Sequence, residues 1–310
     1  MRSALALDIG ATKLAACVVD EEGRASRWTA APTRVEEGPD RILERLLALG
    51  EEALGSAEVE AVGISCGGPL DPAAGLLLGP LHLPGWDRVP VVDLVTRRFD
   101  RPAVLLNDAS AGAWGEHVAG AARGSGSSVY LTVSPGVGGG AVLDGRLLMG
   151  ASGNGGEFGH VLVRPGGRRC DCGRLGCMEA YAAGTQMARR AQEAVAAGER
   201  TALADCDPPT GADVARLAAT DEVARDIWDD AVDALATAVV DLVNVLEPAV
   251  VVLGGGVTGA GEALMGPVRD RVAAETMPPI RAVVRVERAA LGDRAPAVGA
   301  GLRALGAARG

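Results

Sequence analysis

The chain has 310 residues, of which 48% are hydrophobic and 23% charged. That length is enough for two domains, or for one large domain with a sizeable core. The formal net charge is −10 and no run of Lys or Arg stands out, which argues against nucleic acid and anionic membranes as partners. No apolar run approaches the length of a bilayer span, and the start lacks the long apolar region of a signal peptide. We therefore expect a cytoplasmic protein.

The first part of the chain alternates predicted strands and helices. Apolar residues at 4–9 and 14–19 predict two strands joined by a tight turn. Next come, in chain order, a predicted helix (39–54), a strand (59–65), a helix (91–99), a strand (103–106) and a helix (109–119). This alternation is typical of an α/β fold.

A second pair of strands is predicted after residue 125. A strand over 127–133 enters a Gly-rich turn at 136–140, and its partner strand continues over 141–143. Further on, a long amphipathic helix over 221–246 ends before a proline, and a buried strand over 250–253 runs into three glycines. The strand pair at 4–19 and the strand pair at 128–143 resemble each other weakly. We therefore expect two α/β halves with a ligand between them.

The turn Asp8-Ile9-Gly10-Ala11-Thr12-Lys13 carries the first candidate chemistry. A glycine at the tip lets backbone N–H groups and the Thr12 hydroxyl approach phosphate oxygens, and a carboxylate at a strand end can hold a metal ion. Phosphoryl transfer needs this combination, because positioning and charge neutralisation supply most of the catalysis. The spacing is not that of a Walker loop. Taken alone, the motif is more typical of an ordinary hairpin turn.

The run Ser134-Pro135-Gly136-Val137-Gly138-Gly139-Gly140 is a candidate for a second phosphate-binding turn. A Gly-rich bend between two strands is the alternative that the motif alone leaves open. Two such hairpins, one in each half of an α/β chain, favour the phosphate interpretation more than either does singly.

Four potential metal ligands gather in the middle of the chain: His160, Cys170, Cys172 and Cys177. One imidazole and three thiolates form a closed tetrahedral set suited to structural zinc. The Cys-x-Cys and Cys-x4-Cys spacings let a tight loop wrap around an ion. A free-thiol loop or a disulfide is the alternative, which a cytosolic location disfavours. The cysteines outside this cluster are interpreted as core or free thiols.

Three carboxylates have apolar or glycine neighbours: Asp108, Glu157 and Glu179. Near a loop stiffened by zinc, such groups are suited to bind sugar hydroxyls. Asp108 is the candidate general base, because a kinase needs a carboxylate to accept the hydroxyl proton. For each of the three taken singly, a helix cap or a solvated surface residue is the stronger interpretation, and Asp108 in particular is consistent with an N-cap.

Together these motifs resemble the ROK family (repressors, unassigned frames and sugar kinases) over nearly the whole chain. Besides the two turns and the Cys cluster, the resemblance includes Gly63–Leu70, Leu83–Trp86, Asn107–Ala109, Gly156–His160 and Val252–Gly256. It implies an α/β fold of the actin-like ATPase (ribonuclease H-like) type, with two domains and the active site in the cleft between them. Residues 1–108 plus about 297–310 would form the small domain, and 109–296 the large domain with the zinc loop 160–177.

The resemblance also implies a role for each motif. Asp8 would organise Mg²⁺ and phosphate, and the remaining nucleotide-binding residues would be Gly10, Thr12, Lys13, Gly136, Val137, Gly138, Gly139, Gly254, Gly255 and Gly256. The hexose would be bound by Gly68, Asn107, Asp108, Glu157, His160 and Glu179, with Asp108 as the catalytic base. His160 would bind zinc with one ring nitrogen and a sugar hydroxyl with the other.

Two positions depart from the family pattern. Pro135 stands where a Thr usually precedes the Gly-Val-Gly of the second turn, so one N–H and one hydroxyl are absent, and Ser134 is a possible substitute. His82 stands where an Asn commonly precedes Leu-Pro-Gly-Trp. The first departure bears on nucleotide affinity more than on sugar affinity, and the second indicates either an altered sugar or an altered loop.

The sequence therefore predicts an ATP-dependent hexose kinase with Mg²⁺ and structural Zn²⁺, acting on the 6-hydroxyl of glucose. An amino or acylamino hexose, such as 3-amino-3-deoxyglucose or N-acetylmannosamine, is the alternative substrate. A catalytically weak sugar sensor is a further alternative, motivated by Pro135. A ROK repressor is disfavoured, because Asp8 leaves no room for a helix-turn-helix segment before it and the chain is acidic. The resemblance suggests a homodimer or homotetramer.

Overall fold

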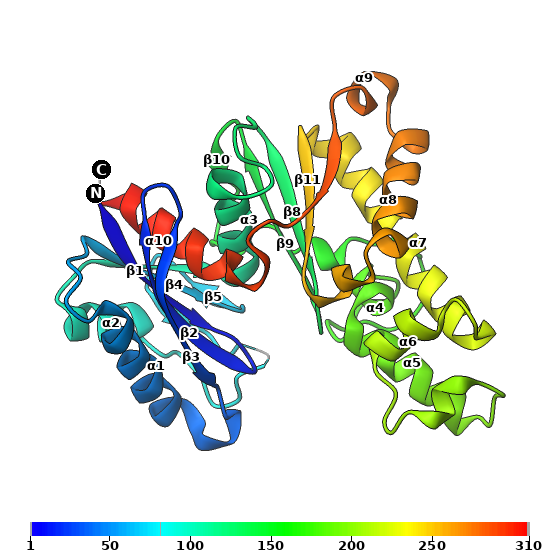
Figure 1. Ribbon diagram of the computed structural model, residues 1–310, viewed down its shortest axis with the longest axis horizontal. Coiled ribbons are helices and arrows are strands. Elements are labelled where there is room, and N and C mark those ends of the chain that lie inside the picture. Colours follow the sequence, from blue (N-terminus) through cyan, green and yellow to red (C-terminus); the bar gives the residue numbers. More distant parts are fainter. Residues whose placement is uncertain (1, 81, 309–310) are drawn as a thin grey trace. The chain divides into compact units, whose positions relative to one another are not determined.

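The computed structural model describes residues 2–80 and 82–308 (Figure 1). The chain divides into two compact units. Unit 1 comprises residues 1–125, 140–156 and 290–310, and unit 2 comprises residues 126–139 and 157–289. Within the described ranges, none of the helices combines the length and the apolar character needed to cross a membrane. The predicted division into a small domain (1–108 plus about 297–310) and a large domain (109–296) stays a prediction.

Unit 1 is built on a five-stranded sheet with the order β3-β2-β1-β4-β7. Its strands are β1 (Ser3–Ile9), β2 (Lys13–Asp20), β3 (Ala25–Pro32), β4 (Ala61–Cys66) and β7 (Ala103–Asn107). The first three strands form an antiparallel meander, while β4 and β7 run parallel to β1. The parallel strands therefore all end at the same edge of the sheet.

Both faces of this sheet are covered, which explains why β1 and β2 are almost continuously apolar. Leu5, Leu7 and Ile9 point into a core shared with α1 (Gly38–Leu54) and α2 (Val91–Phe99). Ala6 and Val19 belong to the opposite core. Figure 1 shows the terminal helix α10 (Ala295–Ala307, red) packed on β1 and β4 of that face, beside α3 (Asp108–Ala119).

Close helix packing on unit 1 depends on a glycine in the middle of β4. A Cβ on Gly63 would lie 2.0 Å from the Ala300 carbonyl oxygen of α10, so no side chain fits there. The α10 backbone can thus approach the sheet closely enough to bury its small residues.

The remaining strands of unit 1 are the small pair β5 (Leu70–Asp71) and β6 (Leu76–Leu77), and β10 (Arg146–Leu147).

A second sheet has the order β10-β9-β8-β11-β12. Its other strands are β8 (Ser128–Val133), β9 (Val137–Leu143), β11 (Val250–Gly254) and β12 (Arg285–Arg288), and β11 runs parallel to β8 and β12. The helices of unit 2 are α4 (Glu179–Ala182), α5 (Gly184–Ala196), α6 (Gly211–Leu217), α7 (Glu222–Leu246), α8 (Glu262–Glu275) and α9 (Pro278–Arg281). The chain passes from unit 2 to unit 1 within β9.

The predicted helices and strands are confirmed, with shifts of one or two residues at their ends. One assignment near the second turn was wrong: β9 begins at Val137, so residues 137–140 belong to the strand and the turn is only Ser134-Pro135-Gly136. Strand pairing gives these glycines extended backbone. The sequence did not indicate β3, β12 or the helices α5, α6, α8 and α10. In α10 most of the apolar residues are Ala, and in α8 the apolar residues do not gather on one face.

Candidate active site

The carboxyl ends of three parallel strands bring the polar residues of unit 1 together. In the register of β1, β4 and β7, Asp8 pairs with Ser65, and Cys66 pairs with Asn107. Asp108 follows directly as the first residue of α3. In open α/β sheets, this edge is where ligands bind, because side chains at neighbouring strand ends converge there.

Asp8 is a buried carboxylate, only 9% exposed, at the end of β1. The Ser65 hydroxyl donates a hydrogen bond to its Oδ1 at 2.6 Å. Burial raises the pKa of Asp8 to about 7, and the nearby charge of Asp108 adds to the rise, while the Ser65 bond and Lys13 oppose it. A cation bound at Asp8 would remove the cost of holding this charge in a low-dielectric place.

Asn107, and not Asp108, is the N-cap of α3. The Asn107 Oδ1 accepts hydrogen bonds from the N–H groups of Ala109 and Ser110, at 2.9 and 3.2 Å. The interpretation of Asp108 as merely an N-cap is therefore wrong. Because its oxygen is used by the cap, the NH₂ group is the part of the Asn107 side chain that could donate to a ligand.

Asp108 retains some solvent exposure, and one of its oxygens accepts a hydrogen bond from Ala109 N at 2.7 Å. Desolvation raises the pKa of Asp108, although the Ala109 bond and the charge of His82 act in the opposite direction. A carboxylate with a raised pKa is a stronger base, and therefore better suited to accept a hydroxyl proton near neutral pH. The glycine turn after β4 lies beside it: a Cβ on Gly67 would be 3.9 Å from Asp108 Oδ2.

The first phosphate-type turn connects β1 and β2 as a tight hairpin. Gly10 N donates to the Lys13 carbonyl at 3.0 Å, and Thr33 Oγ1 donates to the Gly10 carbonyl at 2.6 Å. A Cβ on Gly10 would lie 2.9 Å from the Lys13 oxygen, so this position requires glycine. Thr12 is exposed at the turn, and Lys13 Nζ forms an ion pair with Asp293 at 2.6 Å.

In unit 2, the second turn is held by hydrogen bonds to both Ser134 and Pro135. Ser134 Oγ accepts a hydrogen bond from Gly256 N at 3.2 Å, which ties the turn to the three glycines after β11. The Pro135 carbonyl accepts bonds from Thr185 N and Thr185 Oγ1 at 3.2 and 2.6 Å. Pro135 itself is exposed. The Ser134 hydroxyl keeps its proton for donation to another group.

The glycines after β11 permit a close approach of the backbone to this turn. Gly255 has φ +85, and a Cβ there would lie 2.3 Å from the Val133 carbonyl oxygen and 2.7 Å from Ser134 Oγ. Gly254 sits against Tyr130, and Gly256 is exposed with open space beside it. The glycines after β11 therefore lie directly against the start of the second turn, at Val133 and Ser134.

The four predicted zinc ligands are brought together in unit 2. Their ligand atoms, from His160, Cys170, Cys172 and Cys177, all lie within 4.8 Å of one another. The Cys172 and Cys177 sulfurs are 3.7 Å apart, and Cys170 Sγ is 3.7 Å from His160 Nδ1. Two thiolates bound tetrahedrally to zinc at 2.3 Å would be separated by roughly 3.8 Å. The donor set therefore fits zinc both in chemistry and in spacing.

His160 directs its two nitrogens to different partners. Nδ1 faces the cysteine cluster, while Nε2 lies 3.9 Å from a carboxylate oxygen of Glu157. Glu179 is held between two motifs: its Oε2 accepts a hydrogen bond from Val137 N at 2.9 Å, and its Oε1 is 3.6 Å from Cys170 Sγ. Glu179 thus links the second phosphate-type turn to the metal cluster, a connection that sequence reasoning missed.

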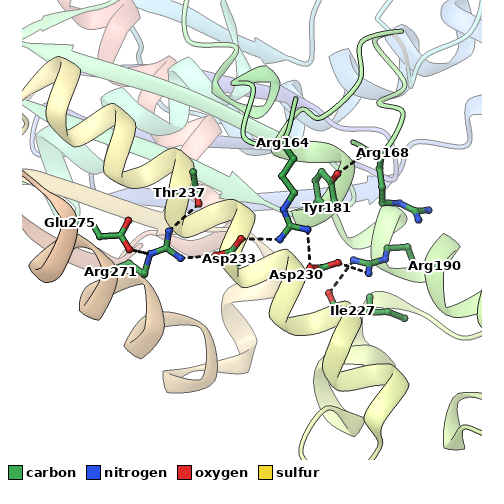
Figure 2. A network of polar contacts seen from close by, with 10 residues as sticks. All are labelled: Arg164, Arg168, Tyr181, Arg190, Ile227, Asp230, Asp233, Thr237, Arg271 and Glu275. Carbon is green, nitrogen blue, oxygen red and sulfur yellow. Dashed lines mark hydrogen bonds and ion pairs between the residues drawn. The ribbon is translucent and has the colours of Figure 1, made fainter. Parts of the chain in front are cut away.

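A network of ion pairs anchors the metal loop to α7 (Figure 2). Arg164 donates to Asp230 and Asp233, both at 2.9 Å, and its guanidinium lies over the Tyr181 ring at 4.7 Å. The Tyr181 hydroxyl accepts a bond from Arg168 N at 2.8 Å. Arg190 and Arg271 join the same two aspartates from α5 and α8. The loop therefore has a scaffold that does not depend on metal alone.

Comparison with known proteins agrees with this arrangement. The family model described as "ROK family" matches residues 4–306. The chain belongs to the ROK family.

Three relatives resemble this ROK chain over most of their length. A glucokinase of Thermotoga maritima is 35% identical over 301 residues, covering 96% of this chain and 95% of the relative. An N-acetylmannosamine kinase of Salmonella heidelberg is 36% identical over 274 residues, covering 88% and 89%. A ROK glucokinase from Streptomyces griseus, solved with glucose and AMPPNP, is 33% identical with a TM-score of 0.82, covering 98% of this chain and 99% of that one. The predicted actin-like α/β fold class is confirmed.

Proposed function

We propose that this ROK protein transfers a phosphoryl group from ATP to a hexose hydroxyl, with the 6-hydroxyl of glucose as the acceptor. The observation that carries the proposal is the pair of desolvated carboxylates, Asp8 and Asp108, at the carboxyl ends of β1 and β7, the two parallel strands on either side of β4. Asp8 directly precedes the first phosphate-type turn and Asp108 is the first residue of α3, so each would have a separate task in phosphoryl transfer. The similarity to a glucokinase that binds glucose and AMPPNP supports both substrates.

Asp108 would accept the proton of the attacking hydroxyl, since its raised pKa favours that role. Asn107 would donate to a sugar hydroxyl through its NH₂ group, and Gly68 would let the sugar approach the backbone. Mg²⁺, when bound with ATP near Asp8, would neutralise phosphate charge. The remaining nucleotide contacts would come from Gly10, Thr12, Lys13, Gly136, Val137, Gly138, Gly139, Gly254, Gly255 and Gly256.

In unit 2, His160, Cys170, Cys172 and Cys177 would hold one structural Zn²⁺. Because Nδ1 of His160 faces the sulfurs, its Nε2 is left to donate to a sugar hydroxyl, beside Glu157. Glu179 would be the remaining hexose contact. Zinc would therefore fix the orientation of a sugar-binding imidazole.

N-acetylmannosamine is a second candidate substrate, favoured by the similar identity to an N-acetylmannosamine kinase. The sensor alternative is weakened by Ser134, whose hydroxyl occupies the second turn beside Pro135. A coupled assay of ADP release tests the function with a panel of glucose, mannose, N-acetylmannosamine and 3-amino-3-deoxyglucose. Absence of ATP-dependent turnover on every hexose, with the protein folded and zinc-loaded, would refute the kinase proposal.

Two further features belong to the same proposal. A thiolate zinc site and a requirement for ATP both fit the reducing cytoplasm. By family resemblance the protein would form a homodimer or homotetramer, which light scattering coupled to size-exclusion chromatography would test.

A further inference from the structure

A loop of unit 1 that no motif singled out lies against the glycine turn after β4. This loop, residues 149–155, closes on itself through a hydrogen bond from Gly155 N to the Met149 carbonyl at 2.9 Å. Gly153 has φ +83, and a Cβ there would lie 2.5 Å from Pro72. The loop therefore packs directly against the segment that follows Gly68.

Asn154 makes the polar contact between the two segments. Its Oδ1 accepts a hydrogen bond from Leu70 N at 3.3 Å, and its Nδ2 donates to the Leu70 carbonyl at 2.9 Å. One side-chain amide thus satisfies both backbone groups of a fully buried residue, as a neighbouring strand would. Nδ2 also reaches Ser152, at 3.2 Å from its carbonyl and 3.3 Å from its hydroxyl.

Gly68 lies between this amide and that of Asn107. A Cβ on Gly68 would be 3.5 Å from Asn107 Nδ2 and 3.8 Å from Asn154 Oδ1. The Asn107 side chain is held in place because it caps α3. The glycine turn has no side chain at Gly67 or Gly68 that could hold the turn in place. The segment after Gly68 is held by Leu78 N, which donates to the Pro69 carbonyl at 3.0 Å, and by the two bonds of Asn154 to Leu70, so Asn154 helps to set the position of Gly68 relative to Asn107.

We propose that Asn154 is a positioning residue for the hexose: by pairing with Leu70 it places Gly68 opposite the donor group of Asn107. The proposal rests on the kinase function proposed above. It concerns sugar affinity only, because the contacts of Asn154 are to the glycine-turn segment and to its own loop. The first phosphate-type turn is stabilised separately, through Thr33.

The test compares Asn154→Ala with Ser152→Ala as the matched control. Asn154→Ala removes both bonds to Leu70, and we expect the hexose KM and the calorimetric hexose Kd to rise about tenfold, with kcat and the ATP KM within about twofold. Ser152→Ala removes only one acceptor of Asn154, at 3.3 Å, and leaves both Leu70 bonds in place. Its hexose KM should equal that of the wild type.

Asn154→Asp keeps the size of the side chain and supplies the measurement if the alanine variant does not fold. It retains an acceptor for Leu70 N but loses the donor to the Leu70 carbonyl, so its hexose KM should also rise. An unchanged hexose Kd in folded Asn154 variants, or a fall in kcat and thermal stability without a change in Kd, would overturn the proposal. Failure of the kinase proposal looks different, because the wild-type protein would then itself phosphorylate no hexose.

Discussion

Asp8 should make the ligand-free protein less stable as the pH rises, and Asp8→Asn should remove that dependence. The native pKa is about 7, whereas the ordinary value is 3.8. The folded protein therefore binds this proton more tightly than the unfolded chain does. Its stabilising contribution is fully present below pH 3.8 and is lost as the pH rises to about 7.

The size of the effect follows from the shift. A difference of about three pKa units corresponds to about 4 kcal/mol in the free energy of unfolding, at 1.36 kcal/mol per unit. Part of this stabilisation is already lost at pH 5. From pH 5 to pH 8 we therefore expect the free energy of unfolding of the Asn variant to rise by roughly 2–3 kcal/mol relative to that of the wild type. Asn keeps an oxygen that can accept the Ser65 hydrogen bond, so that bond contributes little to the pH dependence.

Urea unfolding of the nucleotide-free protein at pH 5, 6, 7 and 8, without added Mg²⁺, measures this difference directly. Asp241→Asn, at an exposed position on α7, is the control and should show no such trend. The same Asp8→Asn variant should lose turnover, because the carboxylate would serve Mg²⁺ and phosphate. A stability difference that is independent of pH, or that shrinks as the pH rises, would refute the reasoning about a desolvated carboxylate.

Three other predictions concern catalysis, metal and nucleotide. Asp108→Asn should keep hexose affinity by calorimetry while kcat falls on the order of 10²- to 10⁴-fold, and a near-normal kcat would place the base elsewhere. Elemental analysis should find about one zinc per chain, and Cys172→Ser should lower zinc content, melting temperature and hexose affinity together; a metal-free yet fully active wild type would contradict this. Pro135→Thr adds an N–H and a hydroxyl while keeping the carbonyl that Thr185 binds. A bond to phosphate contributes roughly 1.5–3 kcal/mol, so the ATP KM should fall about tenfold or more, and an unchanged value would mean that Ser134 already suffices.

The features that could be predicted from the sequence are those whose cause is local. β1 and β2 are apolar at nearly every position because the sheet is covered on both faces, and that pattern is visible in a short window. The metal ligands were visible because three of the four cysteine and histidine donors lie within one loop of eight residues. Periodicity, turn residues and ligand spacing are all properties of neighbouring positions.

The missed features depend on residues far apart in the chain. Ser65 bonds Asp8 only because β4 pairs in parallel with β1 in one particular register. Asn154 meets Leu70 across 84 positions, and Arg164 meets Asp230 across 66. Asn, Arg and Asp are common on surfaces, so nothing in their local sequence distinguishes a buried contact from a solvated side chain. Only the packing of the elements assigns these partners.

The metal loop shows why a kinase of this composition would recruit zinc to shape its sugar site. The small core beneath the loop consists of Cys170, Cys177, Ala180, Tyr181 and Ala234, with Val163 packed against it. So few apolar side chains bury little surface, and surface burial is the main source of folding free energy. Ion pairs to α7 hold one side of the loop, but half-exposed pairs of this kind contribute little each. Four bonds to zinc would supply the missing rigidity at the point where His160 and Glu179 lie, so loss of the metal should lower hexose affinity together with stability.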